Sequence, residues 1–325
     1  MVELVGISQQ VLWTSFLILI GIFLFLDLKV FNRKGHEPST KEAIGWTFFW
    51  ICMALLFSLF VFTYFGKTAG IQFLGGYLLE KSLSVDNLFI IFLIFQSLNV
   101  EKKHQHKVLF WGIVGVLILR GVFIVLGTAL VSQFHWLFYI FGIFLIYSGI
   151  NLFLKKDDKF DPHESFVVKA IRRIMPVSKS QEGGKFMVIE NGKRAVTILF
   201  VALMVIEFTD LLFALDSIPA IFGITTDPFI VFTSNIFAIL GLRSLYFLIA
   251  KMHDAFIFLK EGLSAVLVFI GIKMLFMDVV HMDVAHSLLV ILLLLGISIV
   301  FSIIYGKKKA AADAKKVPAK RKTKK

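Results

Sequence analysis

The sequence predicts an all-α, polytopic membrane protein, a bundle of about nine transmembrane helices. Two features of the composition lead to this class: 58% of the 325 residues are hydrophobic, and only 17% are charged. A soluble domain has about 45–50% apolar and about 25% charged residues. The third feature is the recurrence of apolar runs of about 20 residues, the length that a helix needs to cross a bilayer. Together these observations disfavour a soluble globular protein.

Nine apolar runs are long enough to span a membrane. In chain order they cover roughly residues 11–30, 44–65, 71–98, 107–131, 134–154, 195–222, 229–250, 260–278 and 284–305. We therefore expect residues 1–306 to form one transmembrane domain. The only sizeable soluble piece is the connection 155–194, in which the pair Asn191-Gly192 predicts a small β-hairpin.

The basic residues between the spans predict the orientation. With the N-terminus outside, the connections on the inner side hold 28 Lys and Arg residues, and those on the outer side hold one, Lys67. Cytoplasmic loops of membrane proteins carry an excess of Lys and Arg. We therefore expect a multi-pass protein with its N-terminus outside, and with the connection 155–194 and the C-terminus in the cytoplasm.

The final segment, 307–325, accounts for most of the net charge of +12. It holds ten basic residues and one acid, which gives +9. A Lys/Ala-rich segment of low complexity cannot bury a core, so we expect a disordered basic cytoplasmic tail. Such a tail attracts anionic lipid headgroups. Basic runs also bind nucleic acids, but nothing else in the chain resembles a reader of bases, and no nucleic-acid partner is expected.

Spans three to five resemble spans six to eight. Spans three and six each carry two carboxylates six residues apart, Glu80 and Asp86 in one and Asp210 and Asp216 in the other. The segment LILRGVFIVLG in span four is similar to LGLRSLYFLIA in span seven. The segment IYSGINLF in span five is similar to FIGIKMLF in span eight. Because three spans cross the membrane an odd number of times, the second repeat begins on the opposite side and its topology is inverted. The sequence thus predicts a 3+3 inverted repeat, a frequent plan of secondary transporters, with the site near the midplane.

Five carboxylates lie on the two spans that this repeat brings together. They are Glu80, Asp86, Glu207, Asp210 and Asp216. Ionisable groups inside a membrane are costly and mark functional sites by default. Five acids so close together cannot all stay ionised without cations. The alternative is structural ion pairing with the basic residues of the spans, which are Lys81, Arg120, Arg243 and Lys273.

Helix geometry limits how these acids can meet. Residues six apart on a helix point about 120° apart, so convergence requires a local break. Pro219 predicts one in span six, because it removes the hydrogen bond to the carbonyl of Leu215. Three polar residues could support a break in span three, namely Ser82, Ser84 and Asn87. We expect Arg120 and Arg243 to hold helices or carboxylates in place.

The ligand types indicate the class of metal. The spans offer carboxylate, hydroxyl and amide oxygens at this place, without Cys or His. Such oxygen sites suit Mg²⁺, Ca²⁺ and Mn²⁺, whereas Zn²⁺ and Cu⁺ prefer nitrogen and sulfur.

Three segments carry a resemblance to a known family. GGYLLEKSLSVDNLF (75–89), IEFTDLLFALDSIPAIFGITTDPFIVFTSNIFAILGLRSLYF (206–247) and LVFIGIKML (267–275) resemble the TerC family of bacterial membrane proteins, and its Alx-like branch most closely. The likeness covers roughly residues 11–305. It implies an Mn²⁺ exporter of the bacterial inner membrane, related to the LysE superfamily. It also implies a metal site at the same five acids, with Asn87 and Asn235 assisting.

The leading hypothesis is a divalent-cation exporter that works by alternating access. Mn²⁺ is then a transported substrate, with Ca²⁺ or Mg²⁺ as alternatives, and no organic cofactor or enzyme activity is expected. Close carboxylates can share a proton, so proton counter-transport fits the same site. Two alternatives are a non-transporting membrane assembly or stress-complex protein, and an intramembrane hydrolase that uses Asp86 and Asp216 as an acid/base pair.

Overall fold

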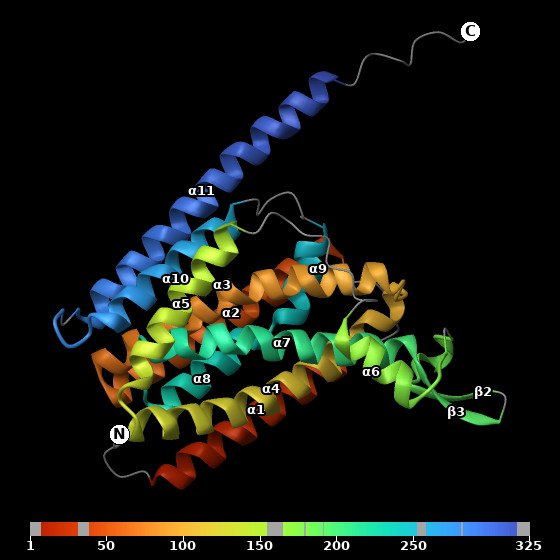
Figure 1. Ribbon diagram of the computed structural model, residues 1–325, viewed down its shortest axis with the longest axis horizontal. Helices are drawn as coiled ribbons and strands as arrows, with labels where there is room; N and C mark the ends of the chain where they lie inside the picture. Colours follow the sequence, from red (N-terminus) through yellow and green to blue (C-terminus); the bar gives the residue numbers. More distant parts are fainter. Residues whose placement is uncertain are drawn as a thin grey trace.

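The computed structural model describes most of the chain. The described residues are 8–31, 39–154, 165–178, 180–190, 192–251, 258–280 and 282–316. Within them the protein is a bundle of long helices with one small sheet at one end, drawn on the right of Figure 1.

All nine apolar runs are helical. They form α1 (Gln9–Phe31), α2 (Thr40–Phe65), α3 (Lys67–Ser97), α4 (Lys102–Gln133), α5 (Leu137–Leu154), α7 (Ile198–Phe222), α8 (Pro228–Ile239) with α9 (Leu242–Lys251), α10 (Leu259–Leu275) and α11 (Val284–Lys316). In the described part of the chain, six helices are long and apolar enough to cross a membrane, or seven if the bent pair α8–α9 counts as one span. The two remaining runs, α3 and α10, are not among them, so the count of nine stays a prediction.

The seventh run is interrupted between α8 and α9, which meet at an angle of 41°. Gly241 lies at this break with φ +83°, a conformation that side chains other than glycine rarely adopt. The backbone there also packs against Trp50 of α2, and a Cβ at Gly241 would come within 2.7 Å of the indole. Both the bend and the contact therefore require glycine.

The break that the sequence predicts at Pro219 is absent. Helix α7 continues through Pro219 and ends at Phe222. Because Pro219 lies in the last turn, its ring removes one hydrogen bond near the end of the helix and leaves the preceding turns intact. The backbone near Asp216 is helical, so the predicted break in this span is wrong for this conformation.

The connection before α7 carries a short helix and the sheet. Its elements are α6 (Phe166–Ile174), β1 (Val177–Ser178), the 3₁₀ turn η2 (Glu182–Gly184), β2 (Met187–Glu190) and β3 (Lys193–Thr197). β3 lies between the other strands, parallel to β1 and antiparallel to β2, and Val188 pairs with Ala195. Gly192 turns the β2–β3 hairpin with φ +75°, where the sequence predicts an Asn-Gly turn.

Polar contacts hold this sheet segment against the connection between α3 and α4. The Lys107 ammonium donates to the carbonyl of Gly184 at 2.8 Å, and the backbone N–H of Glu101 donates to the side chain of Gln181 at 2.9 Å. The start of α4 and the start of α7 therefore lie at the same end of the bundle. The connections α4–α5 and α10–α11 lie at the opposite end, where the Tyr139 hydroxyl donates to Asp278.

Helices α5 and α10 approach each other most closely through glycines. A Cβ on Gly271 would meet the carbonyl of Gly142 at 2.6 Å, and a Cβ on Gly149 would meet the carbonyl of Ser264 at 2.9 Å. Small residues allow such close contact between membrane helices. Gly271 meets Gly142, which lies seven residues before Gly149, and Gly149 meets Ser264, which lies seven residues before Gly271. An inverted repeat, whose halves are related by a two-fold axis, requires such reciprocal contacts. The repeat stays a prediction, and this contact supports it.

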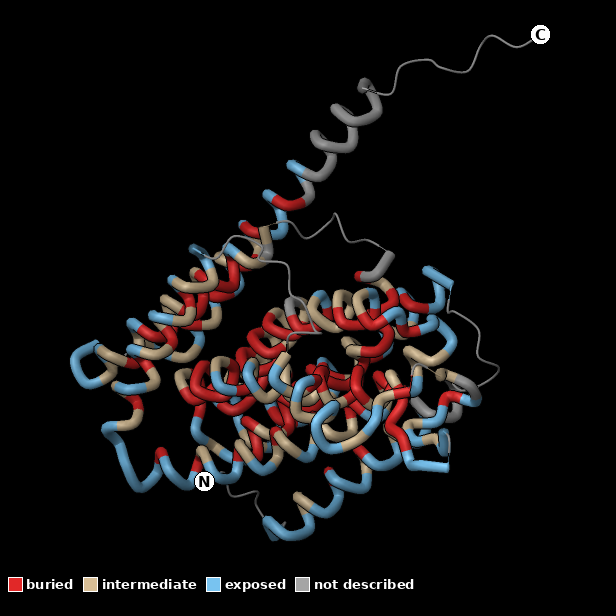
Figure 2. The backbone as a smooth tube through the Cα atoms, turned by 45° about the vertical axis from the view of Figure 1, so that its right-hand side comes forward, coloured by how far each residue is buried: buried red, intermediate tan, exposed pale blue. Residues whose placement is uncertain are grey.

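Buried residues occupy the interior of the bundle, and exposed residues its outer faces (Figure 2). Many of the exposed side chains are large and apolar, among them Phe25, Phe48, Ile118, Ile143 and Phe301. A contiguous apolar periphery of this kind suits contact with lipid rather than with water.

The basic tail begins as helix and not as irregular chain. Helix α11 continues to Lys316, ten residues into the segment expected to be disordered. Ala and Lys have high helix propensity, which explains why an established helix continues into this composition. Residues 317–325 lie outside the described part of the chain.

The glycine contact between α5 and α10 predicts opposite effects for one substitution at two sites. Gly271→Ala places a Cβ against the Gly142 carbonyl, so it should lower the free energy of unfolding by about 1–3 kcal/mol, the usual cost of overpacking. Gly296→Ala meets nothing within 4 Å and should leave stability unchanged or raise it by about 0.5–1 kcal/mol. Denaturant unfolding in detergent measures both, and equal effects would contradict the close packing.

Candidate functional site

The centre of the bundle holds an ion-pair network built from three helices. Glu80 of α3 and Asp210 of α7 both contact the guanidinium of Arg120, which lies on α4. The exposed fractions are 0% for Glu80, 1% for Arg120 and 8% for Asp210. Because α3 packs against α7 and α7 packs against α4, the network joins helices that already touch.

The guanidinium is bound in a fixed geometry. Its Nη2 donates to Asp210 Oδ1 at 2.9 Å and its Nε donates to Asp210 Oδ2 at 3.1 Å, which is a bidentate pair. Its Nη1 donates to Glu80 Oε1, and to the amide oxygen of Asn235 at 3.3 Å. Bidentate guanidinium–carboxylate pairs are among the stronger and more directional hydrogen bonds in proteins.

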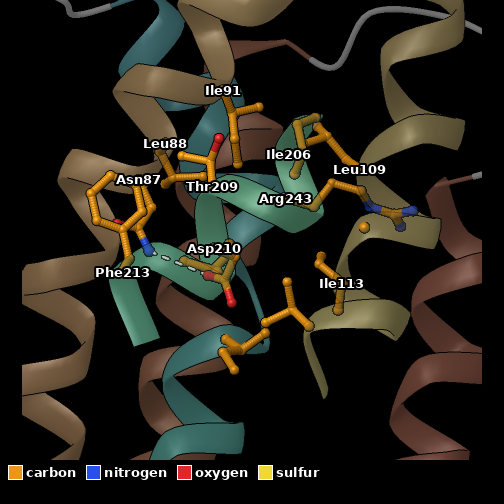
Figure 3. A pocket seen from close by; sticks show the side chains of 14 residues that line it. Asn87, Leu88, Ile91, Leu109, Ile113, Ile206, Thr209, Asp210, Phe213 and Arg243 are labelled. Carbon is orange, nitrogen blue, oxygen red and sulfur yellow. Dashed lines mark hydrogen bonds between the residues drawn. The ribbon is translucent and has the colours of Figure 1, made fainter. Parts of the chain in front are cut away.

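Amides from two other positions complete the network. Asn235 of α8 donates through Nδ2 to Glu80 Oε2 at 3.2 Å, and Asn87 of α3 donates to Asp210 Oδ1 at 3.4 Å (Figure 3). The Ser84 hydroxyl lies 3.5 Å from Glu80 Oε1. Four of the supporting residues predicted from the sequence, Ser84, Asn87, Arg120 and Asn235, thus contact the two acids.

The start of helix α8 is fixed by an N-terminal cap. Asp227 caps the helix, and its Oδ1 accepts hydrogen bonds from the backbone N–H groups of Phe229 at 3.0 Å and Ile230 at 3.1 Å. Pro228 occupies the first turn, where its missing N–H costs nothing. The cap sets where α8 begins, and Asn235 follows two turns later.

Glu207 lies one turn before Asp210 on α7, as the i, i+3 spacing predicts. Its carboxylate lies directly against Gly115 of α4, at a place that any Cβ would fill. The Oε2 atom is buried and has no hydrogen-bond partner among the described residues. Glu207 is therefore a carboxylate close to the network that no cation of the network covers.

The other two predicted acids behave differently. Asp216 is half-buried and accepts a hydrogen bond at 2.7 Å from the hydroxyl of Ser148 on α5. Ser148 was not among the predicted site residues, although a serine in the largely apolar segment IYSGINLF is a signal that could have identified it. Asp86 continues the helix α3, and its side chain lies outside the described part of the structure.

A cavity of about 40 Å³ adjoins the network. Its lining comes from α3, α4, α7 and the α8–α9 break, and its polar members are Asn87, Thr209, Asp210 and Arg243. Figure 3 shows Asp210 and Arg243 at this cavity. A single water needs about 10–15 Å³, so the space holds water or a small ion. Asp210 faces it, whereas the fully buried Glu80 does not line it.

The network can bind a cation, and the cation present is a guanidinium. Glu80, Glu207 and Asp210 are three carboxylates for the one guanidinium of Arg120, so the group has an excess of negative charge when all are ionised. Within the described residues, however, three or more His, Cys, Asp or Glu side chains do not gather in a group that could hold a metal ion. The structural ion pairing considered above therefore applies to Glu80 and Asp210 in this conformation.

Comparison with known proteins gives the family. Residues 65–310 match the family described as "Integral membrane protein TerC family". The chain is 50% identical to "Uncharacterized membrane protein STKORF319" of Myxococcus xanthus, over 95% of this chain and 97% of the relative. It is 42% identical to "Putative membrane-bound redox modulator Alx" of Salmonella typhi, over 91% and 95%. The protein of that name in Escherichia coli K12 is 40% identical, over 87% and 91%.

No solved structure matches the chain. The family match covers more than half of the sequence, and the relatives align over most of their length. The chain therefore belongs to the TerC family of integral membrane proteins.

Proposed function

We propose that this protein transports a divalent cation across the membrane, with Mn²⁺ as its substrate, through Glu80 and Asp210. The observation that carries the proposal is the placement of these two carboxylates on different helices, deep in an apolar bundle, with Asp210 at the edge of a cavity. A carboxylate in such a place is costly unless a cation accompanies it. A pair contributed by two helices can open and close around an ion when the helices move.

The donor set favours a hard divalent ion. Glu80, Asp210, Asn87, Asn235 and Ser84 present carboxylate, amide and hydroxyl oxygens. Such oxygens suit Mn²⁺, Mg²⁺ and Ca²⁺ better than Zn²⁺ or Cu⁺. Glu207, whose Oε2 has no hydrogen-bond partner among the described residues, adds a further carboxylate within one turn of Asp210. The family resemblance supports Mn²⁺ among these ions.

The cavity supports a direction of transport. It lies toward the end of the bundle that carries the sheet segment, which the distribution of basic residues assigns to the cytoplasm. An ion from that side meets Asp210 before Glu80, because only Asp210 lines the cavity. Asp216 lies further along α7 toward the other end. We therefore propose export by alternating access as the direction consistent with this order of contacts, and carboxylates that release the metal can carry protons back.

A second candidate is a membrane assembly protein that transports nothing. The pairing of Glu80 and Asp210 with Arg120 favours it, because a purely structural network would look the same. The relatives in Salmonella typhi and Escherichia coli are named redox modulators, and redox modulation is therefore a further function to consider. An intramolecular dithiol couple needs two cysteines, and the 325 residues contain one, Cys52. Metal binding separates the two candidates.

Metal-dependent stabilisation tests the proposed substrate. An ion that binds only the folded protein raises the free energy of unfolding by about 2.7 kcal/mol at about 100 times its Kd. Thermal unfolding of the purified protein in detergent should show this rise with Mn²⁺, a smaller one with Ca²⁺ and Mg²⁺, and the smallest with Zn²⁺. Absence of a shift with every ion would favour the assembly role.

The same assay assigns the ion to the network. Glu80→Gln leaves Arg120 paired with Asp210, so the variant should fold. Because it removes one carboxylate of the proposed site, it should lose most of the stabilisation by Mn²⁺. The matched control is Glu190→Gln, which makes the same change at an exposed position of β2. It should keep the shift, and loss of the shift in the control alone would point to a surface site.

Transport should depend on the acids of α3 and α7. Inside-out vesicles that contain the wild type should take up Mn²⁺, and Asp86→Asn, Asp210→Asn and Asp216→Asn should each reduce the uptake about tenfold or more, which corresponds to about 1.4 kcal/mol. Glu190→Gln again serves as the control. Uptake at the wild-type rate in all three Asn variants would rule out this site.

A further inference from the structure

Arg120 occupies the place where a transported ion would have to bind. Both oxygens of Asp210 and the Oε1 of Glu80 accept hydrogen bonds from its guanidinium. The remaining Glu80 Oε2 accepts from Asn235. All four carboxylate oxygens are therefore engaged, and three of them by the arginine. A metal ion that bound Glu80 and Asp210 together would have to share three of these four oxygens with the positively charged guanidinium, and the repulsion between the two cations disfavours that arrangement.

The charges also argue against simultaneous binding of Arg120 and a metal ion to the two carboxylates. Two carboxylates that face each other in a low-dielectric interior need a nearby positive charge to remain ionised. The guanidinium supplies one such charge, and it is itself 1% exposed. Removal of one member of a buried ion pair leaves an uncompensated charge, which is strongly unfavourable. Whenever Arg120 leaves, another cation has to take its place, and whenever that cation leaves, either protons or the returning guanidinium have to neutralise the two carboxylates.

We propose that Arg120 is a tethered cation that competes with the transported divalent ion for Glu80 and Asp210. This inference rests on the proposed function and adds the means by which the empty site is neutralised. When the ion binds, the guanidinium withdraws from both acids. When the ion is released, the guanidinium returns, and the unloaded protein can reorient without carrying two bare carboxylates through the membrane.

The arrangement also gives selectivity by charge. A monovalent ion such as Na⁺ brings no more charge than the guanidinium and lacks its directional hydrogen bonds, so it has no means to displace Arg120. A divalent ion brings twice the charge to the same two carboxylates. The cavity gives it a first contact with Asp210, before Glu80 is reached. Displacement can thus begin at Asp210 and be completed at Glu80.

Arg243 provides a matched comparison. It is nearly as buried as Arg120, with 3% exposed, and it lines the same cavity. The predicted repeat makes the two arginines equivalent in sequence, but the ion pairs with Glu80 and Asp210 involve Arg120. A change of Arg243 therefore tests whether any loss of positive charge near the cavity has the same effect.

The experiment compares Mn²⁺ binding and flux in wild type, Arg120→Gln, Arg120→Lys and Arg243→Gln. Titration calorimetry of the full chain in detergent should show about tenfold or more tighter Mn²⁺ binding for Arg120→Gln, because the competitor is gone. Arg120→Lys should change in the same direction by less, and Arg243→Gln should not reproduce the tighter binding of Arg120→Gln, because the ion pairs with Glu80 and Asp210 involve Arg120. In proteoliposomes, Arg120→Gln should retain Mn²⁺/Mn²⁺ exchange but lose net flux about tenfold or more.

The outcomes separate this inference from the proposed function. If the wild type binds Mn²⁺ and Arg120→Gln binds no tighter, Arg120 is a structural residue and only this inference is overturned. If neither protein binds Mn²⁺, the proposed function and the inference are both overturned. Should Arg120→Gln fail to fold, Arg120→Lys decides alone, and wild-type affinity together with wild-type net flux would overturn the competition.

Discussion

The rest of the structure depends on one constraint, the presence of two buried carboxylates on different helices that share one guanidinium. Glu80 and Asp210 bring negative charge into the interior of a bundle in which most buried residues are apolar. Arg120 makes this arrangement tolerable, and the amides of Asn87 and Asn235 complete the hydrogen bonding. Four helices, α3, α4, α7 and α8, are thereby tied to a single point. Any rearrangement of these helices has to change that network.

Several features of the fold are compatible with such a rearrangement. Helices α8 and α9 form a bent pair at Gly241, so one side of the cavity is built from a broken helix rather than a rigid one. Helices α5 and α10 pack glycine against backbone with reciprocal spacing. This is the kind of close, smooth contact along which two halves of an inverted repeat can move. The polar network and the glycine contact lie at different places in the bundle, so motion at one need not disrupt packing at the other.

Much of this could be predicted from the sequence, because membrane constraints are severe. The positions of the helices follow from the apolar runs, and Glu80 and Asp210 stand out because acids are rare in such runs. That Arg120 holds carboxylates was expected, but the two acids it pairs with could not be predicted, because the pairing depends on the relative rotation of three helices. The break was misplaced at Pro219 because the effect of a proline depends on where its helix ends. Ser148 was missed because a single hydroxyl is weak evidence until its neighbour, Asp216, is known.

The central claim is that the guanidinium and a divalent ion alternate at one pair of carboxylates. The most direct test is a structure determined in the presence of Mn²⁺, with the ion located by its anomalous scattering. The account predicts an anomalous peak within about 2–2.6 Å of oxygens from both Glu80 and Asp210, the range for hard cations with oxygen ligands, and the guanidinium of Arg120 withdrawn from both acids. A peak elsewhere, or Arg120 still paired with both carboxylates at saturating Mn²⁺, would contradict it.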